Sequence, residues 1–128
     1  MVLTNSGGSL YTAARAPQHN RDANQLWDIR ELSNGEWGFI YSKYFDTVLD
    51  VMYSNKKEGA TLITYKKTSG VNQLWKYENG FIISKLNDFA MQIKDAKRVF
   101  LSSVKQSARH QKWSFQYPHK RGRNYCLV

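Results

Sequence analysis

Short runs of apolar or alternating residues, rather than long amphipathic stretches, divide this chain. Four such runs lie in its middle third, at residues 38–42, 48–51, 61–66 and 73–77. Residues typical of turns separate them, namely Asp46, Ser54, Asn55, Ser69 and Gly70. Runs of this length and composition predict strands. No stretch keeps a 3.6-residue apolar period between helix caps, so the pattern predicts an all-β protein with almost no helix.

The same spacing predicts strands on either side of the middle third. In the last third the runs lie at residues 80–84, 90–93, 99–104 and 111–116. The first third offers three runs, at residues 2–4, 10–14 and 25–30, and none precedes Met1. The string Asn-Tyr-Cys-Leu-Val at 124–128 resembles the run at 80–84, so we expect it to return and pair beside Met1. A barrel without this strand would expose unpaired backbone edges. The alternative is a chain cut from a larger protein, with a frayed tail.

A repeat organises these runs. The string Gln-x-Trp, followed by one residue and an apolar one, occurs at 25–27, 73–75 and 111–113. A second string, Gly-Phe-Ile-x-Ser, occurs at 38–42 and 80–84. The glutamines are 48 and 38 residues apart and the glycines 42, close to one third of 128 residues. This spacing predicts a single domain, 1–128, built from three four-stranded units. Their approximate bounds are 1–35, 36–78 and 79–116, with a tail at 117–128 that closes the barrel.

Three units of this length, each with a Gln-x-Trp near its end, resemble the β-trefoil of the ricin B family, also called R-type lectins. The resemblance covers nearly the whole chain. In that family the tryptophans of the motif pack in the shared core, which implies a structural role for Trp27, Trp75 and Trp113. The resemblance also implies a module that binds carbohydrate and performs no catalysis.

The resemblance implies a sugar site in the second unit. In the family the ligand residues are an acid in a Leu-Asp-Val string, an aromatic platform and an Asn-Gln pair, which correspond here to Asp50, Tyr65, Asn72 and Gln73. A carboxylate accepts hydrogen bonds from two sugar hydroxyls, amides donate and accept, and an aromatic face covers the C–H side of a pyranose. We therefore expect galactose-type or related glycans as ligands. Ile63 stands where some members have glutamine, so one polar contact is missing.

The other two units depart further from the family pattern. In the third unit Gln92 replaces the acid, Ser103 falls at the platform position and His110 replaces the asparagine, which leaves Gln111. The first unit keeps Asn24 and Gln25 but has Thr4 at the acidic position and a lengthened loop. Sugar binding is therefore expected mainly in the second unit. Even there, an aspartate and an Asn-Gln pair have an alternative role, because both also stabilise turns.

Charge adds a second functional hypothesis. The formal net charge is +9, and residues 65–128 hold 13 Lys/Arg against 3 Asp/Glu, whereas residues 1–64 hold 6 against 7. The last 24 residues contain six cations and no acid: Lys105, Arg109, Lys112, Lys120, Arg121 and Arg123. Such a surface attracts polyanions, including sulfated glycans such as heparin, acidic lipid headgroups and nucleic acid. The alternative is a surface that only aids solubility.

The remaining chemistry is sparse. The chain has no phosphate loop, no Gly-x-Ser-x-Gly and no His-Glu-x-x-His, and His19, His110 and His119 share no ligand spacing. We expect no enzyme, no cofactor and no metal. Cys126 is the single cysteine; we expect it buried in the closing strand, and it slightly favours a reducing compartment. No signal or membrane span is visible, and one good site per chain would favour an oligomer or a partner domain.

Overall fold

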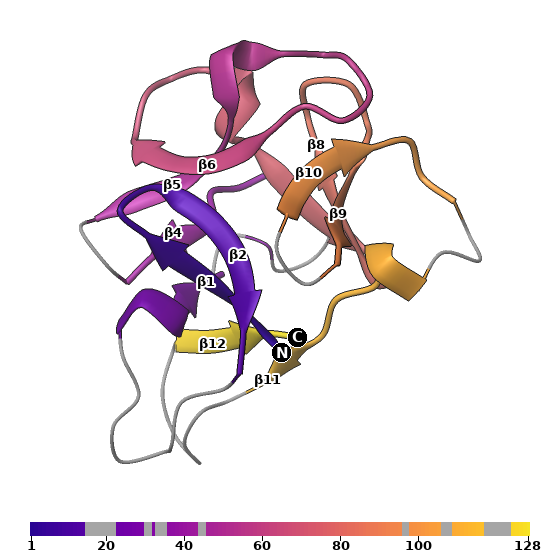
Figure 1. Ribbon diagram of the computed structural model, residues 1–128. Helices are drawn as coiled ribbons and strands as arrows, with labels where there is room; N and C mark the ends of the chain where they lie inside the picture. Colours follow the sequence, from indigo (N-terminus) through magenta and orange to yellow (C-terminus); the bar gives the residue numbers. More distant parts are fainter. Residues whose placement is uncertain are drawn as a thin grey trace.

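The computed structural model describes residues 1–14, 23–29, 32, 36–43, 46–95, 98–105, 109–116 and 124–128. These residues form twelve strands and several short 3-10 turns, arranged around one core (Figure 1). The prediction of an all-β protein is confirmed. Within the described ranges no helix is long and apolar enough to cross a membrane.

The strands follow the three predicted units. The second unit contains β4 (Tyr41–Ser42), β5 (Thr47–Val51), β6 (Leu62–Lys66) and β7 (Trp75–Glu78). The third contains β8 (Phe81–Ser84), β9 (Ala90–Lys94), β10 (Arg98–Ser102) and β11 (Phe115–Gln116). The first contains β1 (Val2–Ser6), β2 (Ser9–Ala13) and β3 (Trp27–Asp28), to which β12 (Asn124–Leu127) adds a fourth strand.

Pairing joins the units into one structure. One sheet has the order β1-β2-β6-β5-β4-β3-β12-β11 and the other β10-β9-β8-β7, with all registered pairs antiparallel. Gly38 and Trp75 exchange two backbone hydrogen bonds of 2.8 Å, which link the two sheets in the barrel. Leu101 N donates to Ala60 O at 2.9 Å and links the hairpins that cap it.

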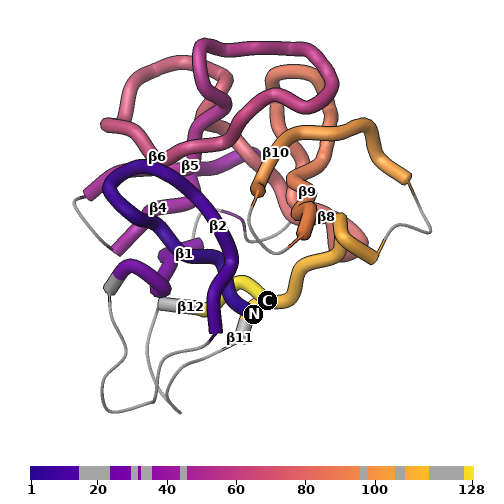
Figure 2. Tube along the Cα trace, in the orientation of Figure 1, coloured from indigo at the N-terminus to yellow at the C-terminus, as the bar shows by residue number. Residues whose placement is uncertain are grey.

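The C-terminal strand closes the barrel. In β12, Tyr125 pairs with Trp27 of β3 and Leu127 with Phe115 of β11. Its place beside β3 matches that of Gly38 beside Trp75, so it supplies the first strand of the first unit. The predicted closing tail is thus confirmed, with the detail that its registered partners are β3 and β11 while β1 packs alongside. The two termini consequently lie together (Figure 2).

The three tryptophans occupy equivalent places in the core. Trp27, Trp75 and Trp113 are buried, and each indole Nε1 donates to a backbone carbonyl of its own unit. The acceptors are Leu3 O at 3.1 Å, Leu49 O at 3.0 Å and Met91 O at 3.0 Å. Each acceptor directly precedes the position where the family pattern places an acid. The indole therefore ties the outer hairpin of each unit to the barrel.

The glutamines of the repeat lie in 3-10 turns, whereas the sequence predicts that they begin strands. They end the 3-10 turns η2 (Ala23–Gln25), η5 (Val71–Gln73) and η6 (Arg109–Gln111), and the strands β3 and β7 begin two residues later. The turn directs the glutamine side chain back to the preceding loop. Gln73 Nε2 donates to Lys66 O at 2.8 Å while Thr68 N donates to Gln73 Oε1 at 2.7 Å. The prediction that these glutamines begin strands was therefore wrong. In a strand, the amide would not reach the preceding loop.

Candidate functional site

A cavity of about 350 Å³ lies over the outer hairpin of the second unit. Its lining residues come from β5, the 3-10 turn η4 (Met52–Ser54), β6 and the segment before β7. They are Asp50, Met52, Tyr53, Ser54, Ile63, Tyr65, Thr68 and Asn72. Three of the four residues predicted for a sugar site thus share one cavity, and Gln73 does not line it.

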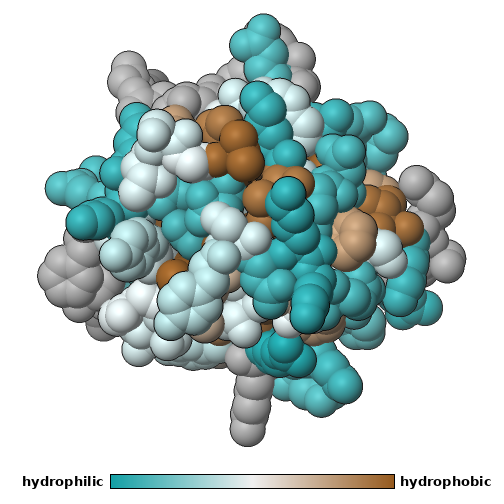
Figure 3. Space-filling model, turned by 90° about the horizontal axis from the view of Figure 1, so that it is seen from above, coloured by the Kyte–Doolittle hydropathy of each residue, from teal (hydrophilic) through white to brown (hydrophobic). Residues whose placement is uncertain are grey.

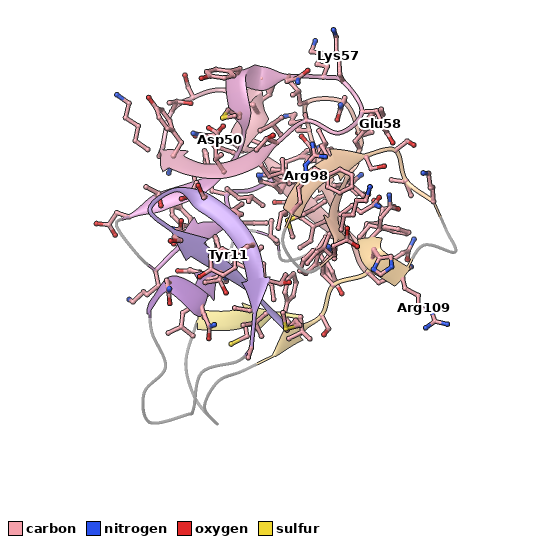
Figure 4. The ribbon with its side chains drawn as sticks, in the orientation of Figure 1. Tyr11, Asp50, Lys57, Glu58, Arg98 and Arg109 are labelled. Carbon is pink, nitrogen blue, oxygen red and sulfur yellow. The ribbon has the colours of Figure 1, made fainter. Side chains whose placement is uncertain are left out.

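Asp50 is the charged group of the cavity. Its side chain is 4% exposed, and in Figure 4 it lies between β6 and the η4 turn. Gln73 Nε2 donates to Asp50 Oδ2 at 2.8 Å. Burial raises the pKa of the Asp50 carboxyl above its ordinary value, and hydrogen bonds from Gln73 and Asn72 act in the opposite direction. The result is a desolvated carboxyl held in one orientation at the base of the cavity.

Gln73 lies beneath the cavity rather than in its wall. Its side chain is fully buried and its amide contacts Asp50, the Lys66 carbonyl and the Thr68 N–H. It therefore acts as a positioning residue for Asp50, where the sequence pattern implied direct contact with ligand.

Tyr65 and Asn72 form the sides of the cavity. In the register of β5 and β6, Asp50 is opposite Ile63 and Val48 opposite Tyr65. Because strand residues two apart share a face, Ile63 and Tyr65 both face the cavity side of the hairpin. Tyr65 is 48% exposed, and Lys66 Nζ lies 6.0 Å from its ring centroid, so a ligand can reach much of this residue. Asn72 Nδ2 donates to Val51 O at 3.2 Å and fixes the amide beside Asp50.

Four more residues line the cavity without having been predicted as site residues: Met52, Tyr53, Ser54 and Thr68. Tyr53 and Ser54 have left-handed backbone, with φ of 58° and 50°. Turn-forming Ser54 and Asn55 had predicted a turn at this point. The aromatic Tyr53 inside that turn was the available sign in the sequence that the turn contributes to a binding site.

The third unit keeps a hollow at the equivalent place, of about 750 Å³, with different chemistry. Gln111 repeats the pattern of Gln73, since its Nε2 donates to Gln92 Oε1 at 3.0 Å and to Ser103 O at 2.7 Å. The register pairs Ala90 with Ser102, so Ser102, and not Ser103, corresponds to Tyr65. Its hydroxyl donates to Glu58 Oε1 at 2.5 Å. The residue at the platform position of the third unit therefore bonds to a carboxylate of the second unit, Glu58.

The first unit is described in part. Gln25 Nε2 donates to Ala14 O at 3.0 Å and approaches Thr4 Oγ1 at 3.4 Å. Ala13 is opposite Val2 in the register, at the position that corresponds to Tyr65. Its lengthened loop, residues 15–22, lies outside the described residues. The described part of this unit therefore has neither the acid nor an aromatic platform.

The basic cluster is also described in part, because Lys120, Arg121 and Arg123 lie outside the described residues. Lys105 and Arg109 are exposed, and Figure 4 shows Arg109 pointing away from the protein. Lys112 Nζ donates to Asn79 O at 2.7 Å and lies 4.0 Å from the ring centroid of Phe81. Part of this positive charge is thus engaged in packing.

Metal ligation finds no support in the described part of the chain, where no three His, Cys, Asp or Glu residues gather. His19 and His119 lie outside that part. Cys126 is a free, fully buried thiol in β12.

Comparison with known proteins identifies the fold. No family model matches the chain. A segment of 52 residues is 40% identical to Mucoricin from Rhizopus delemar and covers 39% of this chain and 35% of that protein. The designed threefold-symmetric protein ThreeFoil superposes on 96% of this chain and 83% of its own with a TM-score of 0.66 at 20% identity. The C-half of an earthworm R-type lectin, solved with GalNAc, superposes on 71% of this chain and 85% of its own, with a TM-score of 0.56 at 23% identity.

The fold is the β-trefoil. In the terms of that trefoil, the cavity at Asp50 belongs to the second repeat, the hollow at Gln92 to the third, and β12 is the first strand of the first repeat.

Proposed function

We propose that this β-trefoil is a carbohydrate-binding module without catalytic activity, and that it holds a galactose-type or related sugar in the second-repeat cavity. The observation that carries the proposal is the combination of a buried, oriented Asp50 carboxyl with the half-exposed Tyr65 in one cavity. A polar anchor beside an aromatic platform suits a pyranose, which has hydroxyls at its edge and C–H groups on its face.

Four lining residues, and Gln73 beneath them, have distinct roles in the proposed complex. Asp50 accepts hydrogen bonds from two neighbouring sugar hydroxyls, and Asn72 bonds to one of them. Tyr65 covers the C–H face of the ring, while Ile63 supplies an apolar wall. Gln73 keeps the carboxyl of Asp50 in place from below. The earthworm R-type lectin half, which has the same fold, was solved with GalNAc, and this supports the choice of galactose-type sugars.

A glycan array read at low and at high salt tests the proposal. Recognition through Asp50 and Tyr65 predicts binding to neutral, galactose-containing glycans that changes little with salt. Loss of all binding to neutral glycans, with retention of sulfated ones, would contradict it.

The second candidate is a polyanion-binding trefoil, favoured by the exposed Lys105 and Arg109 and by the cations at 120, 121 and 123. It predicts affinity for heparin-like chains that falls steeply as salt rises, because each neutralised anionic group releases counterions. The double substitution Arg121→Ala with Arg123→Ala would abolish this binding and leave neutral-sugar binding unchanged.

A further inference from the structure

We infer that Tyr53 forms a second aromatic surface at the cavity, so that the second repeat takes a neutral glycan of at least two sugar residues instead of a single sugar. This inference rests on the proposed function and adds the class of ligand. It starts from the two exposed tyrosines that line one cavity, Tyr53 and Tyr65.

Tyr53 presents nearly its whole side chain to solvent. It is 91% exposed, compared with 48% for Tyr65 and 46% for Val71. Aromatic rings usually contribute by burying their surface, so a ring left open at the rim of a cavity is available to a ligand. Tyrosine suits such a role because its rigid ring makes a large contact with little loss of conformational freedom, and its hydroxyl adds a hydrogen bond.

The backbone at Tyr53 would suit glycine better. Its φ of 58° and ψ of 21° lie in the left-handed region, and Ser54 follows with φ of 50°. The same turn position has φ of 59° at Gly7 in the first repeat and 56° at Asp95 in the third, so the conformation belongs to the fold. A bulky residue rarely adopts it. What tyrosine offers here over glycine is its side chain, at a residue that lines the cavity.

The segment after Tyr53 is anchored to the third repeat. Asn87 Nδ2 donates to Lys56 O at 3.0 Å, Arg98 Nη2 to Gly59 O at 2.7 Å, and Gly59 N to Leu101 O at 2.7 Å. Figure 4 shows Lys57 and Glu58 on this segment above Arg98. At its start, Asn55 N donates to Met52 O at 3.2 Å. Tyr53 is therefore carried by a fixed segment, and little ordering is needed when a ligand binds.

These features define the ligand chemistry. One galactose-type residue bonds to Asp50 and Asn72 and stacks on Tyr65, and the residue linked to it lays its C–H face on Tyr53. No charged side chain lines this cavity apart from Asp50, among the residues that the structure describes, which favours a neutral partner sugar.

Calorimetric titration with methyl β-galactoside and with lactose tests the inference on the full chain. We expect the wild type to bind lactose about three- to tenfold more tightly than methyl β-galactoside, as one added aromatic contact predicts. Tyr53→Ala should remove this advantage and leave the affinity for methyl β-galactoside unchanged. Val71→Ala, an exposed apolar residue outside the cavity lining, is the control and should change neither affinity.

Three outcomes would overturn the inference: equal affinities of the wild type for the two sugars, an unchanged lactose advantage in Tyr53→Ala, or an equal loss for both sugars in that variant. Each of these leaves the proposed function standing. If the wild type binds neither sugar and no neutral glycan, the proposed function fails as well, so the two failures are distinguishable.

Discussion

Burial of the Asp50 carboxyl costs free energy on folding, and the same buried carboxyl is well placed to bind a sugar. A carboxyl that is 4% exposed loses most of its hydration, and the hydrogen bonds from Gln73 and Asn72 return part of that free energy. A sugar with two hydroxyls in reach would return more. Binding would therefore offset part of the free energy that folding spends on burying this carboxyl.

Substitution of the two main ligand contacts provides the first prediction. Asp50→Ala removes the charged acceptor and Tyr65→Ala the stacking face, and each should weaken sugar binding by about 1–3 kcal/mol, or about tenfold to a hundredfold. Both variants should fold, because neither side chain belongs to the apolar core. Titration with the best glycan of the array measures the effect. Gln92→Ala, at the equivalent position of the third repeat, should leave neutral-sugar binding unchanged, and a loss there would place the site elsewhere.

The raised pKa of Asp50 leads to a second prediction, on stability. Because the folded-state pKa lies above the unfolded one, folding favours the protonated carboxyl. The stabilisation is present below the unfolded pKa and is lost as pH rises through the folded pKa. Asp50→Asn, which keeps an oxygen for Gln73, does not titrate. Its melting temperature relative to wild type should therefore be higher at pH 7 than at pH 3. A difference that does not vary with pH would contradict the raised pKa.

Among the elements, the 3-10 turn that carries each glutamine of the repeat connects the fold to the ligand position. The same side-chain amide bonds to the loop backbone and to residue 50 in the second repeat, or to residue 92 in the third. The repeat motif thus fixes the fold in every unit. Its effect on ligand binding depends on whether the glutamine amide bonds to an acid, as at Asp50, or to another amide, as at Gln92.

This arrangement gives a third prediction with its own matched control. Gln73→Ala leaves the Lys66 carbonyl, the Thr68 N–H and Asp50 without their partner and should lower the free energy of unfolding by about 1–3 kcal/mol. It should also weaken sugar binding, because Asp50 loses its orientation. Gln111→Ala should destabilise the fold similarly without changing sugar binding. Denaturant unfolding and titration of both variants test this, and equal effects on binding would argue against a positioning role.

Most of the strands and the three-unit order were predictable from the sequence, because strand periodicity and the Gln-x-Trp motif record contacts that each unit repeats. The 3-10 turns were not, since the residues beside each glutamine are compatible with a strand as well as with a turn. The equivalence of Ser103 with Tyr65 was wrong by one residue because the loop between β9 and β10 is shorter than that between β5 and β6, and counting cannot locate the deletion. The place of Tyr53 at the cavity depends on the left-handed backbone of its turn, for which an aromatic residue inside a predicted turn was the one sign in the sequence.

On the scale of the whole molecule, the three hairpins form one end of the protein. Figure 3 shows the protein from above the view of Figure 1, where apolar side chains reach the surface in small groups among hydrophilic ones. Contacts between repeats, such as Ser102 with Glu58, join neighbouring hairpins there. The second-repeat cavity is thus supported by the third repeat as well as by its own.

The fourth prediction concerns closure of the barrel. Deletion of residues 124–128 removes the fully buried Cys126 and Leu127 and leaves β3 and β11 with unpaired edges. The loss of Leu127 alone should lower the free energy of unfolding by about 2–5 kcal/mol, so the truncated chain should melt at a much lower temperature. Leu127→Ala separates the packing contribution from that of backbone pairing. An unchanged melting temperature after truncation would show that β12 is dispensable.

The position of β12 also has a consequence for the order in which the protein can fold. The first repeat has three strands near the start of the chain and receives its fourth from residues 124–127. During synthesis the second and third repeats can assemble their own strands as they emerge, whereas the first must wait until residues 124–127 have left the ribosome. Contacts between such distant segments form slowly. The first of the three repeats to be made is therefore the last to complete its fold, and until then it offers an open edge to chaperones or to other nascent chains.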